Sequence, residues 1–156
     1  MLSDLIREGL RRGVLFVGAA ASGTSRDDAG LVHQPGVIEV ASSGSQSDPA
    51  GVLYAPGREI LTLLPGGHYD FASGDSIATA QVSGVVALLL ARNPALSAAD
   101  AYRLLRDTSA QSGGGGDTRV DACAAVVSLI RTGSCSPTSN TEHKVAGERE
   151  QRVALH

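Results

Sequence analysis

Residues 71–84, Phe-Ala-Ser-Gly-Asp-Ser-Ile-Ala-Thr-Ala-Gln-Val-Ser-Gly, decide the fold of this chain. Gly74 permits a tight turn, and the mostly apolar run as far as Arg92 predicts a helix that begins at or just after Ser76 and is buried in a domain. Unpaired backbone N–H groups and the positive dipole end collect at a helix start, where they stabilise an oxyanion. Taken alone, the motif allows Ser76 to be a helix cap or a nucleophile.

The residues before this motif predict a parallel sheet. Apolar residues recur at helical spacing over 2–10, Gly13 ends the pattern, and a continuous apolar run follows at 14–17. A helix, a tight turn and a buried strand in this order make half of a crossover unit. Further strands are expected over 37–41, 52–54, 59–64 and 68–71, the last two as a hairpin around Pro65-Gly66-Gly67.

The residues after the motif predict two more helices and a polar tail. Ser97 is placed to cap an amphipathic helix, and a third helix is expected over 120–130. Four glycines at 113–116 predict a flexible link between them. Because the composition turns polar after Arg131, we expect one domain over 1–131 and a disordered tail over 132–156.

Composition narrows the class of protein. The chain has 156 residues, of which 42% are hydrophobic, 3% are aromatic and 19 are glycine, a mixture that favours an α/β fold. A net charge of -3 without a basic cluster argues against a nucleic-acid partner, and no apolar run is long enough for a membrane span. The first residues show no signal peptide, and the location of the protein is not predicted. Cys123 and Cys135 allow one bridge or two unrelated thiols.

Several stretches in a fixed order resemble the subtilase family of serine peptidases. Gly74, Ser76, Ala78, Val82 and Gly84 match in register its nucleophile signature G-T-S-M-A-x-P-x-V-x-G, although Asp75 replaces the usual Thr and Ala80 the usual Pro. Other resembling stretches are 14–23, 35–38, 54–57, 93–97 and 120–126. Order and spacing agree with the family from Leu2 to Leu129.

The resemblance implies a subtilisin-like three-layer α/β fold with a mainly parallel sheet, of which the amino-terminal half is missing. It implies that Ser76 is the nucleophile of a peptidase. Ser22 falls where the family keeps an asparagine that donates to the oxyanion, and a serine hydroxyl is shorter. The stretch matching one side of the pocket for the residue before the scissile bond is Gly18, Ala19, Ala20 and Ala21.

The partners of the nucleophile are not found in the sequence. A serine nucleophile needs a base and a group that orients the base, and the family supplies them from an H-G-T-H and a D-[ST]-G type motif, neither of which occurs here. The histidines are His33, His68, His143 and His156, which we expect to be solvated surface residues. We therefore expect an isolated chain without activity: a truncated product, a cleaved piece or half of a split enzyme, with an exposed apolar sheet edge.

Two other functions stay open. A pseudopeptidase would bind peptides or a partner without cutting them. A serine esterase would use Gly74-Asp-Ser-Ile77, with Asp107, Asp117 or Asp121 and His143 as the remaining triad members. The expected partners are a peptide or protein substrate and the missing amino-terminal half. No cofactor is expected; the family often holds structural calcium, for which no ligand residues are identified here.

Overall fold

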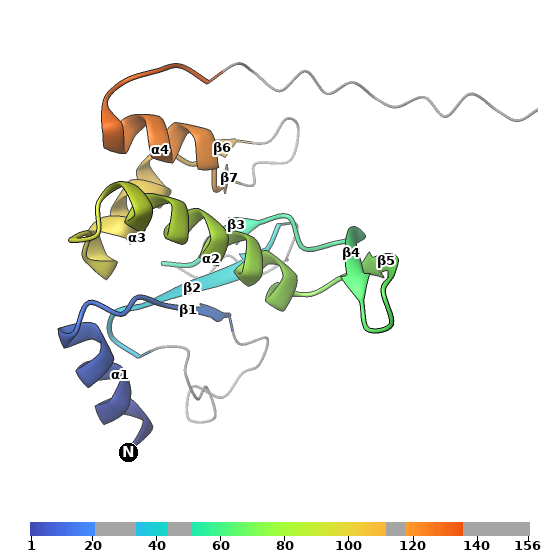
Figure 1. Ribbon diagram of the computed structural model, residues 1–156, viewed down its shortest axis with the longest axis horizontal. Helices are drawn as coiled ribbons and strands as arrows, with labels where there is room; N and C mark the ends of the chain where they lie inside the picture. Colours follow the sequence, from blue (N-terminus) through green and yellow to red (C-terminus); the bar gives the residue numbers. More distant parts are fainter. Residues whose placement is uncertain (21–33, 44–50, 112–117, 136–156) are drawn as a thin grey trace, which may run out of the picture.

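The computed structural model describes residues 1–20, 34–43, 51–111 and 118–135 (Figure 1). Its helices are α1 (Leu2–Arg11), α2 (Asp75–Arg92), α3 (Ala98–Asp107) and α4 (Ala122–Ile130). Its strands are β1 (Phe16–Ala19), β2 (Val37–Ser42), β3 (Leu53–Ala55), β4 (Ile60–Leu64), β5 (His68–Ala72), β6 (Ala110–Gln111) and β7 (Thr118–Arg119). None of these helices is long and apolar enough to cross a membrane.

A parallel sheet with the order β1-β2-β3 forms the centre of the fold, as the apolar runs predict. β1 pairs from Phe16 to Ala19, whereas the sequence suggested 14–17, because Gly13 and the next residues are still needed to turn the chain out of α1. β1 forms one edge of this described sheet. The core between sheet and helices is built from Val, Leu, Ile and Ala, including the fully buried Val40 and Leu89.

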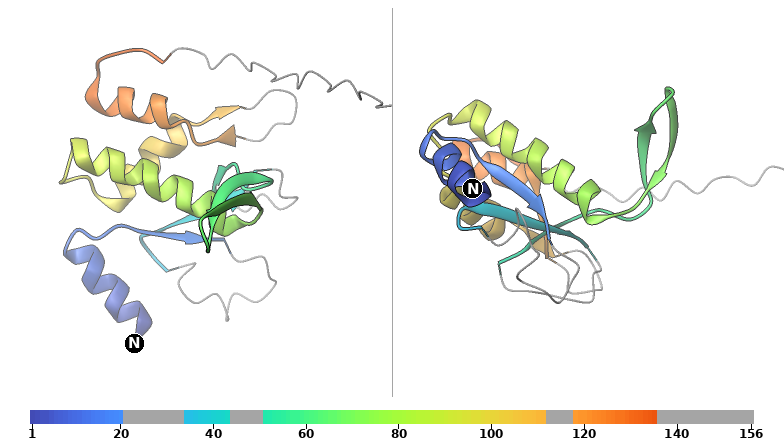
Figure 2. Two further views of the ribbon diagram at one scale, coloured as in Figure 1. Left: turned by 45° about the vertical axis from the view of Figure 1, so that its right-hand side comes forward. Right: turned by 90° about the horizontal axis from the view of Figure 1, so that it is seen from below.

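Helix α2 packs along the sheet and runs opposite to its strands, so that its first residues lie near the strand ends (Figures 1 and 2). Ala78, Val82, Val86 and Leu89 form its buried stripe. The expectation that this helix is buried all round is wrong for the described structure, since Leu88 on another side is 55% exposed. Three strands cover only one face of a helix, which leaves the opposite apolar face uncovered.

Helices α3 and α4 have the side-chain caps that fix their starts. The Ser97 Oγ accepts the Asp100 N–H at 3.1 Å, as predicted. The Ser97 hydroxyl also donates to the Asp100 Oδ2 at 2.6 Å, and this second bond is the main cause that holds the pKa of the Asp100 carboxyl below its ordinary value. Asp121 accepts the Ala124 N–H at 2.8 Å, so α4 begins at Ala122 and not at the predicted residue 120. Capping thus sets both boundaries.

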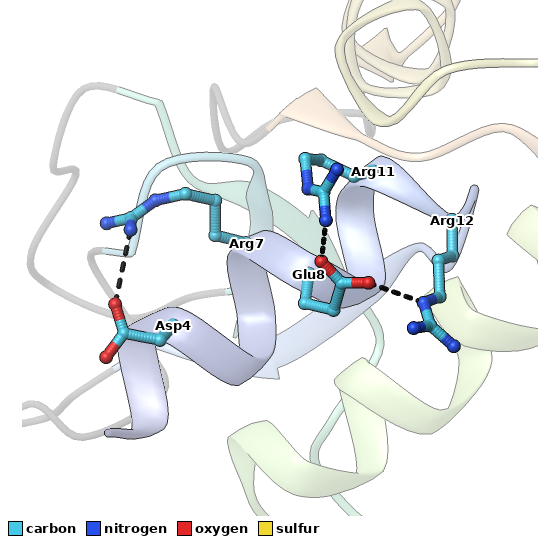
Figure 3. A network of polar contacts seen from close by, with 5 residues as sticks. All are labelled: Asp4, Arg7, Glu8, Arg11 and Arg12. Carbon is cyan, nitrogen blue, oxygen red and sulfur yellow. Dashed lines mark hydrogen bonds and ion pairs between the residues drawn. The ribbon is translucent and has the colours of Figure 1, made fainter.

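Helix α1 combines an apolar contact with an exposed ionic surface. Its Gly9 lies against the Phe16 ring, which an added Cβ would meet at 2.7 Å. On the solvent side Glu8 pairs with Arg12, at 2.6 Å, and with Arg11 (Figure 3). Hydrogen bonds from Arg12 and then Arg11 hold the pKa of the Glu8 carboxyl below its ordinary value. Such exposed pairs add little to stability.

Strands β4 and β5 form the predicted antiparallel hairpin, which projects beyond the start of α2 (Figure 2). The register places Leu61 opposite Phe71 and Leu63 opposite Tyr69, so these four side chains share one face. All four are at least 60% exposed. The hairpin is therefore held to the fold mainly through its ends.

A disulfide joins Cys123 in α4 to Cys135, with their Cα atoms 5.9 Å apart, and settles the alternative that the sequence left open. The bridge attaches Cys135 to α4, and Cys135 lies four residues past the domain boundary predicted at residue 131. The tail predicted over 132–156 lies mostly outside the described residues, as does the glycine link at 113–116.

We expect the double variant Cys123→Ser/Cys135→Ser to lose about 3 kcal/mol of unfolding free energy, because a crosslink over this short loop restricts the unfolded chain. Urea denaturation of the oxidised chain, the reduced chain and the variant provides the measurement. The reduced chain should behave like the variant. Equal midpoints for all three samples would show that the bridge does not constrain the chain.

Candidate functional site

Ser76 is the second residue of α2, and its side chain is exposed. The N-cap is Gly74, with a φ of 151° that disfavours any side chain, and no side chain caps this helix. Ser76 is therefore not a helix cap, which removes one of its two readings. Among the described residues, no base hydrogen-bonds to the Ser76 hydroxyl.

The start of α2 offers backbone donors beside this hydroxyl. Gly74 donates its N–H to the Gly57 carbonyl at 2.7 Å, and Ile77 donates to the Gly74 carbonyl at 3.1 Å. Within the described part of the chain, the N–H groups of Asp75 and Ser76 have no backbone acceptor. These two groups, at the positive end of an 18-residue helix, are suited to hold developing negative charge.

Contacts from three segments fix the position of this helix start. The Asp75 carboxylate accepts the backbone N–H of Ser42, the last residue of β2, at 2.7 Å. The Gln81 amide donates to the Pro56 carbonyl at 2.6 Å. The end of β2, the turn after β3 and the first turns of α2 are thereby held together.

Gly57 lies at the junction of these three segments, the end of β2, the turn after β3 and the start of α2, where they come closest together. A Cβ on Gly57 would lie 2.6 Å from the Ser42 Oγ and 2.9 Å from the Gly74 carbonyl oxygen, distances that real Cβ atoms do not show. Beside it is an open pocket of about 280 Å³, lined by Ser42, Gly57, Arg58, Ser73, Gly74 and Asp75. The Ser42 hydroxyl is buried there without a hydrogen-bond partner among the described residues.

The structure brings part of the predicted site to the same edge. Gly18 and Ala19 end β1, and Ala20 follows with an N–H bond to the Val40 carbonyl at 2.7 Å. Because β1 and β2 are parallel, these residues lie at the strand ends that also meet the start of α2. Ala21 and Ser22 lie outside the described residues.

Among the described residues, no histidine serves as a base for Ser76. His68 is exposed at the start of β5, opposite Leu64, as expected for a surface residue. His33, His143 and His156 lie outside the described residues. Sequence reasoning missed the bond between Asp75 and Ser42 and the close packing at Gly57. The only signal for the first was that Asp75 departs from the family's usual residue.

Comparison with a model of the Subtilase family gives a match over residues 7–143. A search of curated proteins finds no match. Among solved structures, the self-cleaved protease domain of PatA is similar with a TM-score of 0.62 and 24% identity, covering 83% of this chain and 55% of that one. A protease from Pseudoalteromonas arctica PAMC 21717 has a TM-score of 0.65 and 24% identity, covering 81% and 46%.

The Prenylagaramide maturation protease PagA has a TM-score of 0.61 and 24% identity, covering 85% of this chain and 56% of its own. At this identity the likeness to these three proteins shows the fold. The chain spans about half the length of each solved protein. The predicted subtilisin-like α/β fold with a mainly parallel sheet is confirmed, and the partial coverage fits an incomplete domain.

We expect Gly57→Ala to destabilise the chain by about 1–3 kcal/mol, because the new methyl group overlaps Ser42 and the Gly74 carbonyl. Gly84→Ala is the matched control: nothing lies within 4 Å of its added Cβ, and alanine favours the helix by up to about 1 kcal/mol. Denaturant midpoints measure both. Two variants of equal stability would contradict the close packing at Gly57.

Proposed function

Because the chain belongs to the subtilase family, we propose that it carries the nucleophile-bearing half of a serine endopeptidase, with Ser76 as the nucleophile. The position of Ser76 supports this role most directly. Ser76 is exposed in the first turn of α2, beside an N–H group that has no backbone acceptor among the described residues. A peptide or protein is the substrate that family membership implies.

The proposed chemistry is acyl transfer. The Ser76 Oγ attacks the carbonyl carbon of a peptide bond, and its proton passes to a base. The carbonyl oxygen becomes an oxyanion that accepts the Ser76 N–H and is stabilised by the dipole of α2. The amine leaves with the proton, and water then releases the acyl group from Ser76.

The base and its orienting carboxylate are proposed to come from the remaining half of the domain, in the same polypeptide or in another. The printed sequence has neither of the family's motifs for them, and the described His68 lies in the projecting hairpin. We therefore propose that the chain by itself exposes Ser76 and binds peptides without cleaving them. No structural calcium is assigned to it.

The roles of the neighbouring small residues follow from the same proposal. Gly18, Ala19 and Ala20, at the carboxyl end of β1, would line one side of the pocket for the residue before the scissile bond. Without a base, an open pocket of this kind would support peptide binding alone, the pseudopeptidase function. The esterase reading loses its support, because the family match covers the motif on which it depended.

We expect imidazole, added as an external base, to increase the labelling of Ser76 by a fluorophosphonate at least about tenfold, because general-base assistance is worth about 10²–10⁴ in rate. Labelling sites are identified by mass spectrometry. Without imidazole, labelling should not exceed that of Ser76→Ala.

Ser83→Ala is the matched control, since Ser83 also lies in α2 but donates its hydroxyl to the Thr79 carbonyl at 2.8 Å. It should be labelled like the native chain. Strong Ser76-dependent labelling without imidazole would mean that the chain holds its own base. No response to imidazole in a folded sample would support the binding function instead.

A further inference from the structure

We propose that Asp75 is a positioning residue that ties the first turn of α2 to the end of β2 and thereby orients Ser76. The family signature has threonine at this position, whereas this chain carries a carboxylate there. The inference rests on the proposed function only for its effect on Ser76 reactivity. The tie itself is tested without catalysis.

The Ser42 amide, which donates to Asp75, has no partner strand residue within the described part of the sheet. Ser43 donates its N–H to Ala55 of β3, and since successive strand amides point to opposite sides, the Ser42 N–H points toward β1. The described pairing of β1 with β2 ends at Ala19 and Val40. Without Asp75, the Ser42 N–H would therefore have no acceptor among the described residues, in a residue that is 7% exposed, at a substantial free-energy cost.

The Asp75 carboxylate supplies the missing acceptor, with its Oδ1 2.7 Å from the Ser42 nitrogen. A carboxylate in the first turn of a helix is also favoured by the helix dipole. The bond spans 33 residues of sequence and joins the sheet to the helix that carries the nucleophile. Two independent needs, an unpaired strand amide and a positive helix end, are met by one side chain.

Fixing Asp75 also fixes the direction of Ser76. Successive residues of an α-helix are rotated by about 100°, so an Asp75 held toward β2 turns the next side chain away from the sheet. Ser76 is accordingly exposed, whereas Ser42 is buried. Loss of the tie would let the first turn of α2 rotate or fray, and the Ser76 hydroxyl and amide would lose their common direction.

Two variants separate the hydrogen bond from the charge. Asp75→Ala removes both, whereas Asp75→Asn keeps an oxygen acceptor of the same length and removes only the charge. Asp70→Ala is the matched control, because the Asp70 carboxylate also accepts a backbone N–H at 2.7 Å, that of Phe71, but lies in the projecting hairpin.

Amide hydrogen exchange of the full chain, followed by NMR, tests the tie. In Asp75→Ala we expect the Ser42 amide to exchange at least about tenfold faster and the Ser76 amide resonance to shift. In Asp75→Asn the Ser42 rate should stay within about threefold of native, because a neutral acceptor is weaker but still present. Asp70→Ala should change neither the exchange rate of the Ser42 amide nor the resonance of the Ser76 amide. The Val40 and Leu53 amides report any global loss of stability.

An equal exchange rate of the Ser42 amide in the native chain and in Asp75→Ala would overturn the proposal. An equal increase of that rate in Asp75→Ala and Asp75→Asn would overturn it too. If Asp75→Ala does not fold, Asp75→Glu replaces it, because the longer side chain displaces the acceptor oxygen. The Ser42 amide must then be protected from exchange in Asp75→Asn and not in Asp75→Glu. With imidazole present, fluorophosphonate labelling of Ser76 should fall in Asp75→Ala and recover in Asp75→Asn. Absence of labelling in every variant would count against the nucleophile role and leave the exchange result standing.

Discussion

The packing of three backbone segments around Gly57 is the constraint on which the candidate site depends. The turn after β3 fits between the end of β2 and the start of α2 only because residue 57 has no Cβ. That closeness lets the Gly57 carbonyl accept the Gly74 N–H at 2.7 Å, at the residue where α2 begins. The helix start is thereby fixed relative to the sheet, and Ser76 with it.

The polar contacts of the junction act on this packed framework. Asp75 accepts a strand amide that the described part of the sheet does not pair, and Gln81 donates to the Pro56 carbonyl nearly two turns further along α2. Each contact pairs a part-buried polar group and also restrains the helix. The same contacts therefore serve stability and the orientation of the nucleophile, while the projecting hairpin and the outer face of α2 stay largely uncovered.

Local patterns in the sequence predicted the order of the four helices and of β1 to β5, because strand and helix periodicity and capping residues such as Ser97 act over a few neighbours. The two-residue strands β6 and β7 were not predicted, since so short a stretch carries no periodic signal. They placed Ser76 near a helix start but did not identify Gly74 as the cap, since a positive φ leaves no periodic signal. The bond from Asp75 to Ser42 could not be predicted, because it depends on where β1 stops pairing with β2. The Cys123–Cys135 bridge likewise depends on how the chain returns after α4.

A crystal structure of the chain after phosphonylation in the presence of imidazole would test the central claim most directly. We expect a single adduct on Ser76, with a phosphonyl oxygen within about 3 Å of the Ser76 backbone nitrogen, the distance of an ordinary N–H bond. The Asp75 carboxylate should still accept the Ser42 N–H. An adduct on another serine, or a phosphonyl group turned away from the start of α2, would contradict the proposed role of this helix.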